Sequence, residues 1–214
     1  VAGESISVTK TSATLSSPPV GSGVLTTLTL ASSDFTAGSG TVLSNYVLPV
    51  TASASIATVT PRPLAVSMTG IVERVYDGTT NAALIASNYT LTDLVAGESI
   101  SVTQTQGQFA SANAGTGILV STTLGSGAFS AGSGTLLSNY TLPTNVSAAI
   151  GTIVPRPLSV ALTGGVQRAY DGTSTAVLTG GNFSLTGLVS GESVSVTQTQ
   201  GQFASANAGS GLIV

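Results

Sequence analysis

The sequence contains no cysteine, histidine or tryptophan, and charged residues make up only 6% of its 214 residues. The absence of cysteine excludes disulfides, a thiolate nucleophile and cysteine-bound zinc. The absence of histidine excludes a Ser-His-Asp or Cys-His catalytic arrangement. A nucleic-acid surface needs clustered lysine and arginine. Here the net charge is −3 and the five basic residues are scattered, as Lys10, Arg62, Arg74, Arg156 and Arg168.

Long hydrophobic runs are also missing. No stretch approaches the roughly 18 apolar residues that a membrane-spanning helix needs, so we expect no membrane insertion in this segment. The sequence is nevertheless 42% hydrophobic, whereas a disordered linker combines high charge with low hydrophobicity. Abundant threonine and valine with glycine, serine and asparagine are typical of strands joined by turns. Because a long secreted bacterial chain often avoids cysteine, we expect an extracellular or cell-surface location.

The sequence repeats itself with a period of 94 residues and without insertions. Pro-Arg-Pro-Leu at 61–64 and Tyr-Asp-Gly-Thr at 76–79 return at 155–158 and 170–173. Such a repeat array has to be recognised before individual motifs are interpreted, because the function belongs to the array as a whole. We place the boundary at the paired prolines, which hold the backbone extended and remove two ladder donors. The predicted domains are the C-terminal part of a repeat at 1–60, a complete repeat at 61–154 and the N-terminal part of the next at 155–214.

Alternation of apolar and polar residues predicts short strands throughout. Leu64, Val66 and Met68 alternate with small or polar residues, as in a half-buried strand. Asp77-Gly78 predicts a tight turn, because aspartate bonds its own backbone and glycine accepts a positive φ. Pro18-Pro19 followed by Gly21-Ser22-Gly23 predicts a loop, and residues 42–50 are expected to be extended. The predicted fold is all-β, with tandem domains of 94 residues that form an extended rod.

The charged residues that return in each repeat need an explanation in a sequence so poor in charge. Asp93 becomes Gly187, whereas two arginines and two carboxylates are kept per repeat. We interpret the kept set as ion pairs or hydrogen bonds that fix a turn or the junction between repeats. We predict that Arg74 bonds Asp77 or Glu98. The candidate structural residues are Arg62, Arg74, Tyr76, Asp77, Gly78, Glu98, Tyr140, Arg156, Arg168, Tyr170, Asp171, Gly172 and Glu192.

A ligand site built from the same charged groups is the first alternative to a structural role. The sequence supports a catalytic role for them less than a ligand site. A glycosidase would need Asp77 and Glu98 to meet in a cleft, about 5–10 Å apart. Calcium would need six or more oxygen ligands, and the spread of the carboxylates leaves only a site shared at a junction. We therefore expect no enzyme, no cofactor, and no catalytic, cofactor-binding or metal-binding residues.

The motifs also follow one another in a specific order along the whole chain. Pro-Arg-Pro-Leu, Val-Tyr-Asp-Gly-Thr-Thr, Asn-Tyr-Thr-Leu, Gly-Glu-Ser-Ile-Ser-Val, Ala-Asn-Ala-Gly and Ser-Asn-Tyr-Thr-Leu-Pro come in succession. This order resembles the YDG and MBG (mostly β-grasp) repeats of very large secreted bacterial adhesins, often exported by two-partner secretion. The biofilm-matrix adhesins of pseudomonads are similar. The resemblance implies β-grasp-like domains in a stalk, with exopolysaccharide or other cells as partners.

The expected function is a structural stalk in which neighbouring repeats contact one another. One alternative is a repeated module that holds polysaccharide weakly and gains avidity by repetition. Tyr76 and Tyr140 would then be candidate aromatic platforms. Another alternative is self-assembly into extracellular fibres, because a low charge leaves strand edges poorly guarded.

Overall fold

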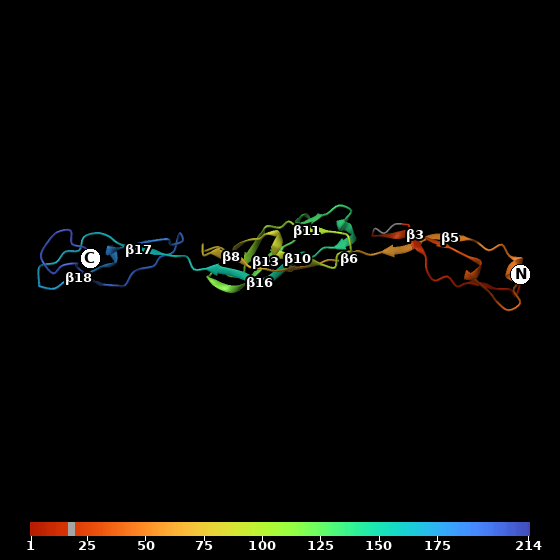
Figure 1. The fold of residues 1–214 in the computed structure, drawn as a ribbon, viewed down its shortest axis with the longest axis horizontal. Coiled ribbons are helices and arrows are strands. Elements are labelled where there is room, and N and C mark those ends of the chain that lie inside the picture. The colour runs from red at the N-terminus through yellow and green to blue at the C-terminus, as the bar shows by residue number, and fades with distance from the viewer. Residues whose placement is uncertain (17–19) are drawn as a thin grey trace. The chain divides into compact units, whose positions relative to one another are not determined.

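The computed structural model describes residues 1–16 and 20–214 (Figure 1). It is built from short strands and 3₁₀ turns, so the prediction of an all-β fold is confirmed. The chain forms two compact units, and the complete repeat contributes residues to both. The first contains Val1–Ser67, Tyr89–Gln104 and Leu124–Val146, and the second contains Met68–Asn88, Thr105–Thr123 and Ser147–Val214. The predicted repeat boundaries and the alignment of repeats into a rod stay predictions.

A three-stranded antiparallel sheet dominates the first unit. Its order is β2 (Thr14–Leu15), β3 (Gly21–Thr29) and β5 (Thr51–Val59). The prediction of a loop at Gly21-Ser22-Gly23 is wrong, because β3 begins at Gly21. The register shifts on both sides of Val24, beside Gly23 at φ +66°. Gly23 therefore lies at a bulge inside a strand, whereas Gly21 pairs regularly with Val59. Pro18-Pro19, the other half of that prediction, lies outside the described residues.

Two-stranded ribbons complete the first unit. The antiparallel pairs are β1 (Ile6–Val8) with β4 (Phe35–Ala37), and β11 (Ile100–Val102) with β14 (Phe129–Ala131). A third ribbon joins β7 (Ala65–Met68) to β10 (Tyr89–Thr92). Pro63, the second of the paired prolines, belongs to β6 (Arg62–Pro63), which runs parallel to β15 (Tyr140–Thr141), whereas Pro61 precedes the strand. The start of the complete repeat thus pairs with a strand near its end.

The second unit contains a five-stranded sheet. Its order is β8 (Val72–Val75), β16 (Asn145–Val154), β13 (Gly115–Thr123), β12 (Gln106–Phe109) and β9 (Asn81–Ala83). The pairing of β16 with β8 is parallel, and β12 is antiparallel to both its neighbours. The core of this sheet contains Val120, Ile153 and Phe109, which are all but fully buried. The alternating apolar residues of the complete repeat therefore face a packed interior, as half-buried strands require.

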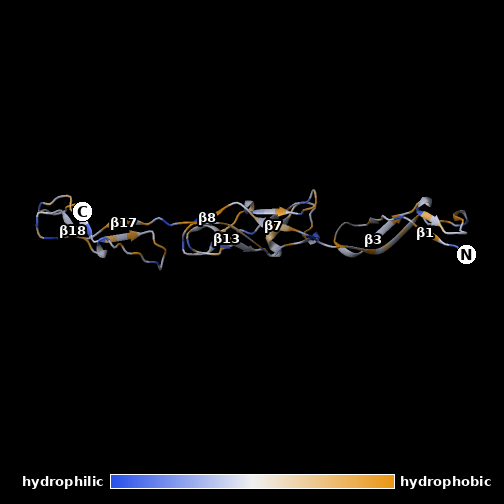
Figure 2. Ribbon diagram, turned by 90° about the horizontal axis from the view of Figure 1, so that it is seen from below, coloured by the Kyte–Doolittle hydropathy of each residue, from blue (hydrophilic) through white to orange (hydrophobic). Residues whose placement is uncertain are grey.

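Residues 155–214 form shorter ribbons in the second unit. These are β17 (Ser159–Leu162) with β19 (Phe183–Thr186), and β18 (Thr175–Val177) with β20 (Gln200–Gln202). Figure 2 shows hydrophobic residues along β17, and Leu162 in that strand is exposed. Met68, which holds the same position in the complete repeat, is buried. Residues 166–169, the counterpart of β8, form no strand.

Short 3₁₀ turns connect the strands. They are η1 (Ser32–Asp34), η2 (Leu43–Asn45), η3 (Ala86–Asn88), η4 (Ser126–Ala128), η5 (Leu137–Asn139) and η6 (Gly180–Asn182). The expectation that residues 42–50 are extended is therefore wrong at η2, where Ser44-Asn45 favours a turn. In the described ranges 1–16 and 20–214, no helix is long and apolar enough to cross a membrane.

Candidate functional site

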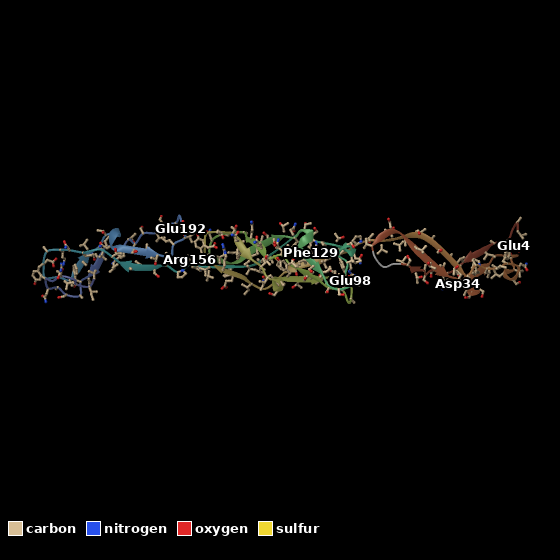
Figure 3. All side chains as sticks on the ribbon, turned by 90° about the horizontal axis from the view of Figure 1, so that it is seen from above. Glu4, Asp34, Glu98, Phe129, Arg156 and Glu192 are labelled. Carbon is tan, nitrogen blue, oxygen red and sulfur yellow. The ribbon has the colours of Figure 1, made fainter. Side chains whose placement is uncertain are left out.

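A tight turn that ends in a carboxylate recurs in each repeat. In the complete repeat, the Glu98 amide donates a hydrogen bond of 3.0 Å to the carbonyl of Val95, and Gly97 has φ +87°. These are the marks of a type II turn, whose third position needs a positive φ and hence favours glycine. The same amide-to-carbonyl bond joins Glu4 to Val1 and Glu192 to Val189. Figure 3 labels the three glutamates.

A tyrosine hydroxyl bonds the carboxylate of this turn. Tyr140, at the start of β15 and only 5% exposed, donates its hydroxyl proton to Glu98. The Val95 amide donates to the same hydroxyl oxygen at 3.0 Å. Tyr46 donates to Glu4 in the same way. The bonds to Glu98 and Glu4 raise the pKa of Tyr140 and of Tyr46, because the carboxylate stabilises the protonated phenol, whereas the bond from the Val95 amide acts to lower that of Tyr140.

The third carboxylate takes its tyrosine from the preceding repeat. Tyr76 donates its hydroxyl proton to Glu192, and this bond raises the pKa of Tyr76. Next to them lies a largely apolar groove of about 320 Å³, whose lining includes Arg156 and Leu158. A Cβ added to Gly78 would lie 3.2 Å from Cγ1 of Val189. Residues from two successive repeats therefore meet here within the second unit.

The Tyr-Asp-Gly-Thr turn is braced by an arginine from β8. Nη1 of Arg74 lies 2.6 Å from Oδ1 of Asp77 and 2.8 Å from Oγ1 of Thr79. The Thr79 amide and hydroxyl donate to Oδ1 of Asp77 at 2.8 and 2.9 Å. These bonds, the one from the Thr79 backbone first, hold the pKa of Asp77 below its ordinary value. Gly78 completes the turn with φ +79°.

The same network recurs 94 residues later. Arg168 bonds Asp171, and its Nη1 lies 2.7 Å from the hydroxyl oxygen of Thr173. The Thr173 amide donates to Asp171 at 2.9 Å, which is again the main cause of a lowered aspartate pKa. Gly172 has φ +76°. The recurrence shows that each repeat encodes its own braced turn.

Both Tyr-Asp-Gly motifs fall in segments matched by a protein family. The YDG domain family matches residues 60–148 and 154–214, which is more than half of the chain. The chain belongs to the YDG domain family. No curated protein and no solved structure matches it.

The remaining arginines of the YDG repeats have less elaborate surroundings. Arg62 is exposed and pairs through its backbone with Tyr140. Nε of Arg156 donates to the backbone carbonyl of Gly187, and Figure 3 labels this arginine together with Glu192. Tyr170, the counterpart of Tyr76, is 68% exposed.

The carboxylates of the YDG repeat are held in separate networks. The predicted bond between Arg74 and Asp77 is present, whereas Glu98 bonds Tyr140. A catalytic pair of Asp77 and Glu98 would compete with both sets of bonds. Within the described part of the chain, there is no group of three or more His, Cys, Asp or Glu residues that could hold a metal ion.

Sequence reasoning did not find the pairing of tyrosine with glutamate. The signal was available, because Glu4 and Tyr46 return together as Glu98 and Tyr140 at the same spacing. It also overlooked Thr79, whose counterpart Thr173 makes the same bonds. An aromatic residue that returns with a carboxylate is the pattern that would have revealed the pair.

Proposed function

We propose that the chain is a stalk segment of a large secreted or cell-surface bacterial adhesin. In this role it extends a binding region in cell–cell or biofilm-matrix adhesion, and it performs no chemistry itself. Its direct partners are the neighbouring repeats of the same chain. Exopolysaccharide or other cells are the partners of the binding region that the stalk carries. Membership of the YDG family and the tandem arrangement support this proposal.

The bond from Tyr76 to Glu192 is the observation that carries the proposal. It joins two residues 116 positions apart, in successive repeats, within one compact unit. A second contact of this kind lies in the other unit, where the Val20 amide donates to Oδ1 of Asn139 at 3.2 Å. In a repeat array, such nearest-neighbour contacts add to the stability of each repeat and limit bending at the joint.

The tyrosine at the start of β15 favours a stalk over an array of glycan-binding platforms. A platform needs an aromatic face open to solvent, and Tyr140 is buried with its hydroxyl bonded to Glu98. Its polar group stabilises the fold of the repeat and is not presented to a ligand. Tyr140, one of the two candidate platforms, is therefore part of the interior of the repeat.

The proposal is tested by measuring how the length of the protein grows with the number of repeats. Proteins carrying residues 61–154 two, four and six times between the same flanking segments would be compared by small-angle X-ray scattering. A stiff stalk gains the same length with each added repeat, whereas a flexible chain grows roughly as the square root of its length. Tyr76→Phe in every repeat should move the scaling toward the flexible case. Square-root growth of the unaltered proteins would contradict the proposal, and binding of polysaccharide by the repeats would favour the glycan-binding alternative.

A further inference from the structure

The braced turn of each YDG repeat contains an aspartate followed by glycine, a pair that is chemically labile. Of the aspartates in the sequence, only Asp77 and Asp171 precede a glycine. Glycine has no Cβ, so its amide nitrogen is sterically accessible to the carboxyl group of the aspartate before it. The side chains of Asp77 and Asp171 are 47% and 55% exposed. Because burial does not protect them, any protection must come from the bonds that hold these carboxylates.

The reaction open to this pair converts aspartate to isoaspartate in two steps. First, the Gly78 nitrogen forms a bond to Cγ of Asp77, and the bond from Cγ to one carboxyl oxygen breaks. That oxygen leaves as water, with the amide proton and the carboxyl proton, and a five-membered succinimide ring is closed. Water then adds to the ring carbonyl that was the Asp77 backbone carbonyl, and the bond from this carbon to nitrogen breaks. The main chain of the product runs through Cβ and Cγ, and one water has been released and one taken up.

The brace opposes the first step in two ways. Oδ1 of Asp77 accepts a hydrogen bond of 2.6 Å from Nη1 of Arg74, and bonds of 2.8 and 2.9 Å from the amide and hydroxyl of Thr79. A carboxyl group held by three donors does not turn freely toward the Gly78 nitrogen. The same bonds stabilise the charged carboxylate and lower the pKa of Asp77. The neutral acid, which is the form that can lose water, is therefore rarer.

The arginine of the brace is itself held in place. Nη2 of Arg74 donates to the backbone carbonyl of Thr79, and the guanidinium lies 5.2 Å from the centroid of the Phe109 ring. The Arg74 side chain is only 16% exposed. Arg168 lies over Phe203 in the same way, at 5.6 Å. The turn therefore cannot open without breaking contacts on both sides of the guanidinium.

We propose that Asp77-Gly78 and Asp171-Gly172 are sites of spontaneous isoaspartate formation whose reaction is suppressed by the arginine brace of each repeat. An isoaspartate carries its carboxylate on Cα and lengthens the main chain by one carbon. It therefore does not fit the bonds that Asp77 makes to Arg74 and Thr79. Refolding does not reverse the change, so a repeat that isomerised once would lose its braced turn permanently.

Slow ageing of the full-length chain tests the proposal, because the two sites report separately. The natural protein and Arg74→Gln would be incubated well below their Tm, beside the natural protein unfolded in urea. Mass spectrometry with electron-transfer fragmentation locates isoaspartate at each site. At Asp77 of the folded natural chain, isoaspartate should form about tenfold more slowly than in the unfolded chain, because the reaction waits for the turn to open. Arg74→Gln removes the charged donor and should raise the rate at Asp77 about fivefold or more, while the rate at Asp171 stays unchanged.

Thr122→Val is the matched control for a loss of stability that leaves the brace intact. Thr122 is buried in β13 of the same sheet, and its hydroxyl donates to the backbone carbonyl of Gln106 at 2.7 Å. The loss of this bond destabilises the sheet, but the rate at Asp77 should stay that of the natural chain. Circular dichroism at the incubation temperature would establish that each variant is folded. Should Arg74→Gln not fold, Thr79→Val removes one donor to Asp77 and should raise the rate there about twofold or more.

Three results would each overturn the proposal. The first is isomerisation of Asp77 in the folded natural chain as fast as in the unfolded chain. The second is an unchanged rate at Asp77 when the brace is removed from a folded variant. The third is an equal rise in Thr122→Val, which would show that the stability of the sheet, and not the brace, controls the reaction.

Discussion

The hydroxyl of Tyr140 donates a hydrogen bond to the carboxylate of Glu98, across 42 residues of the chain. Tyr46 makes the same bond to Glu4 over the same separation. A contact that closes so long a segment connects the type II turn to β15. It joins two polar side chains from distant parts of the repeat.

Removing the Tyr140 hydroxyl should destabilise the complete repeat. Tyr140→Phe keeps the buried ring, but Glu98 and the Val95 amide both lose a hydrogen-bond partner. We expect the Tm to fall by about 5 °C, as the loss of such bonds causes in a domain of this size. Differential scanning calorimetry would measure the change.

Tyr89→Phe is the matched control for that experiment. Its hydroxyl donates to the carbonyl of Gln104 at 2.9 Å, and the next repeat has Phe183 at the same position. The repeat therefore tolerates this change, and the Tm should fall by less than in Tyr140→Phe. An equal or larger fall in the control would show that the bond to Glu98 contributes little.

The bonds between tyrosine and glutamate also predict loss of stability in alkali. The folded protein raises the pKa of Tyr46, Tyr76 and Tyr140 above the ordinary value of 10.0. A raised pKa contributes stability that is complete below about pH 10 and is lost as the pH rises through the raised value. Ultraviolet titration of tyrosinate should show a late fraction in the folded protein. Glu98→Gln should lower the pKa of Tyr140 and so reduce the fraction of tyrosines that ionise late. An unchanged titration curve would contradict the role of Glu98 in raising this pKa.

The braced Tyr-Asp-Gly-Thr turn predicts that the protein also loses stability in acid, because the pKa of Asp77 is lowered. Bonds from Thr79 and Arg74 lower the pKa of Asp77 from its ordinary value of 3.8. A lowered pKa contributes stability that is complete above the ordinary value and is lost as the pH falls through the lowered one. Asp77→Asn should reduce the loss of thermal stability below about pH 4. Asp93→Asn removes an exposed carboxylate outside this turn, and it controls for the loss of one negative charge. An equal change in both variants would contradict a specific contribution of the braced turn.

Local sequence signals predicted the braced turn but not the long-range contacts. Arg74 and Asp77 are three residues apart and return together in the next repeat, and this recurrence suggested a bond from Arg74 to Asp77 or Glu98. Tyr140 and Glu98 are joined only by the fold, and no local propensity brings them together. Gly21 and Gly23 were misread because glycine marks loops but also occurs in strands and at bulges, and only the pairing of β3 with β5 distinguishes these cases.

Exchanges between repeats can reveal packing that a single copy hides. Gly151 in β16 packs on Phe109, so that an added Cβ would lie 2.7 Å from two of the ring carbons. The first repeat has Ala57 and Leu15 at these two positions. Where alanine replaces Gly151, the smaller leucine thus replaces Phe109.

Gly151→Ala alone should therefore destabilise the complete repeat, by about 1–3 kcal/mol, because the core at Phe109 has no room for another methyl group. Phe109→Leu alone should cost roughly 1 kcal/mol or more, since it leaves a cavity and removes the ring that lies 5.2 Å below the Arg74 guanidinium. The double variant reproduces the natural pair of the first repeat, so its cost should be smaller than the sum of the two single costs. A double-mutant cycle from urea unfolding would measure the coupling. Additive costs would show that the two positions vary independently in the repeats.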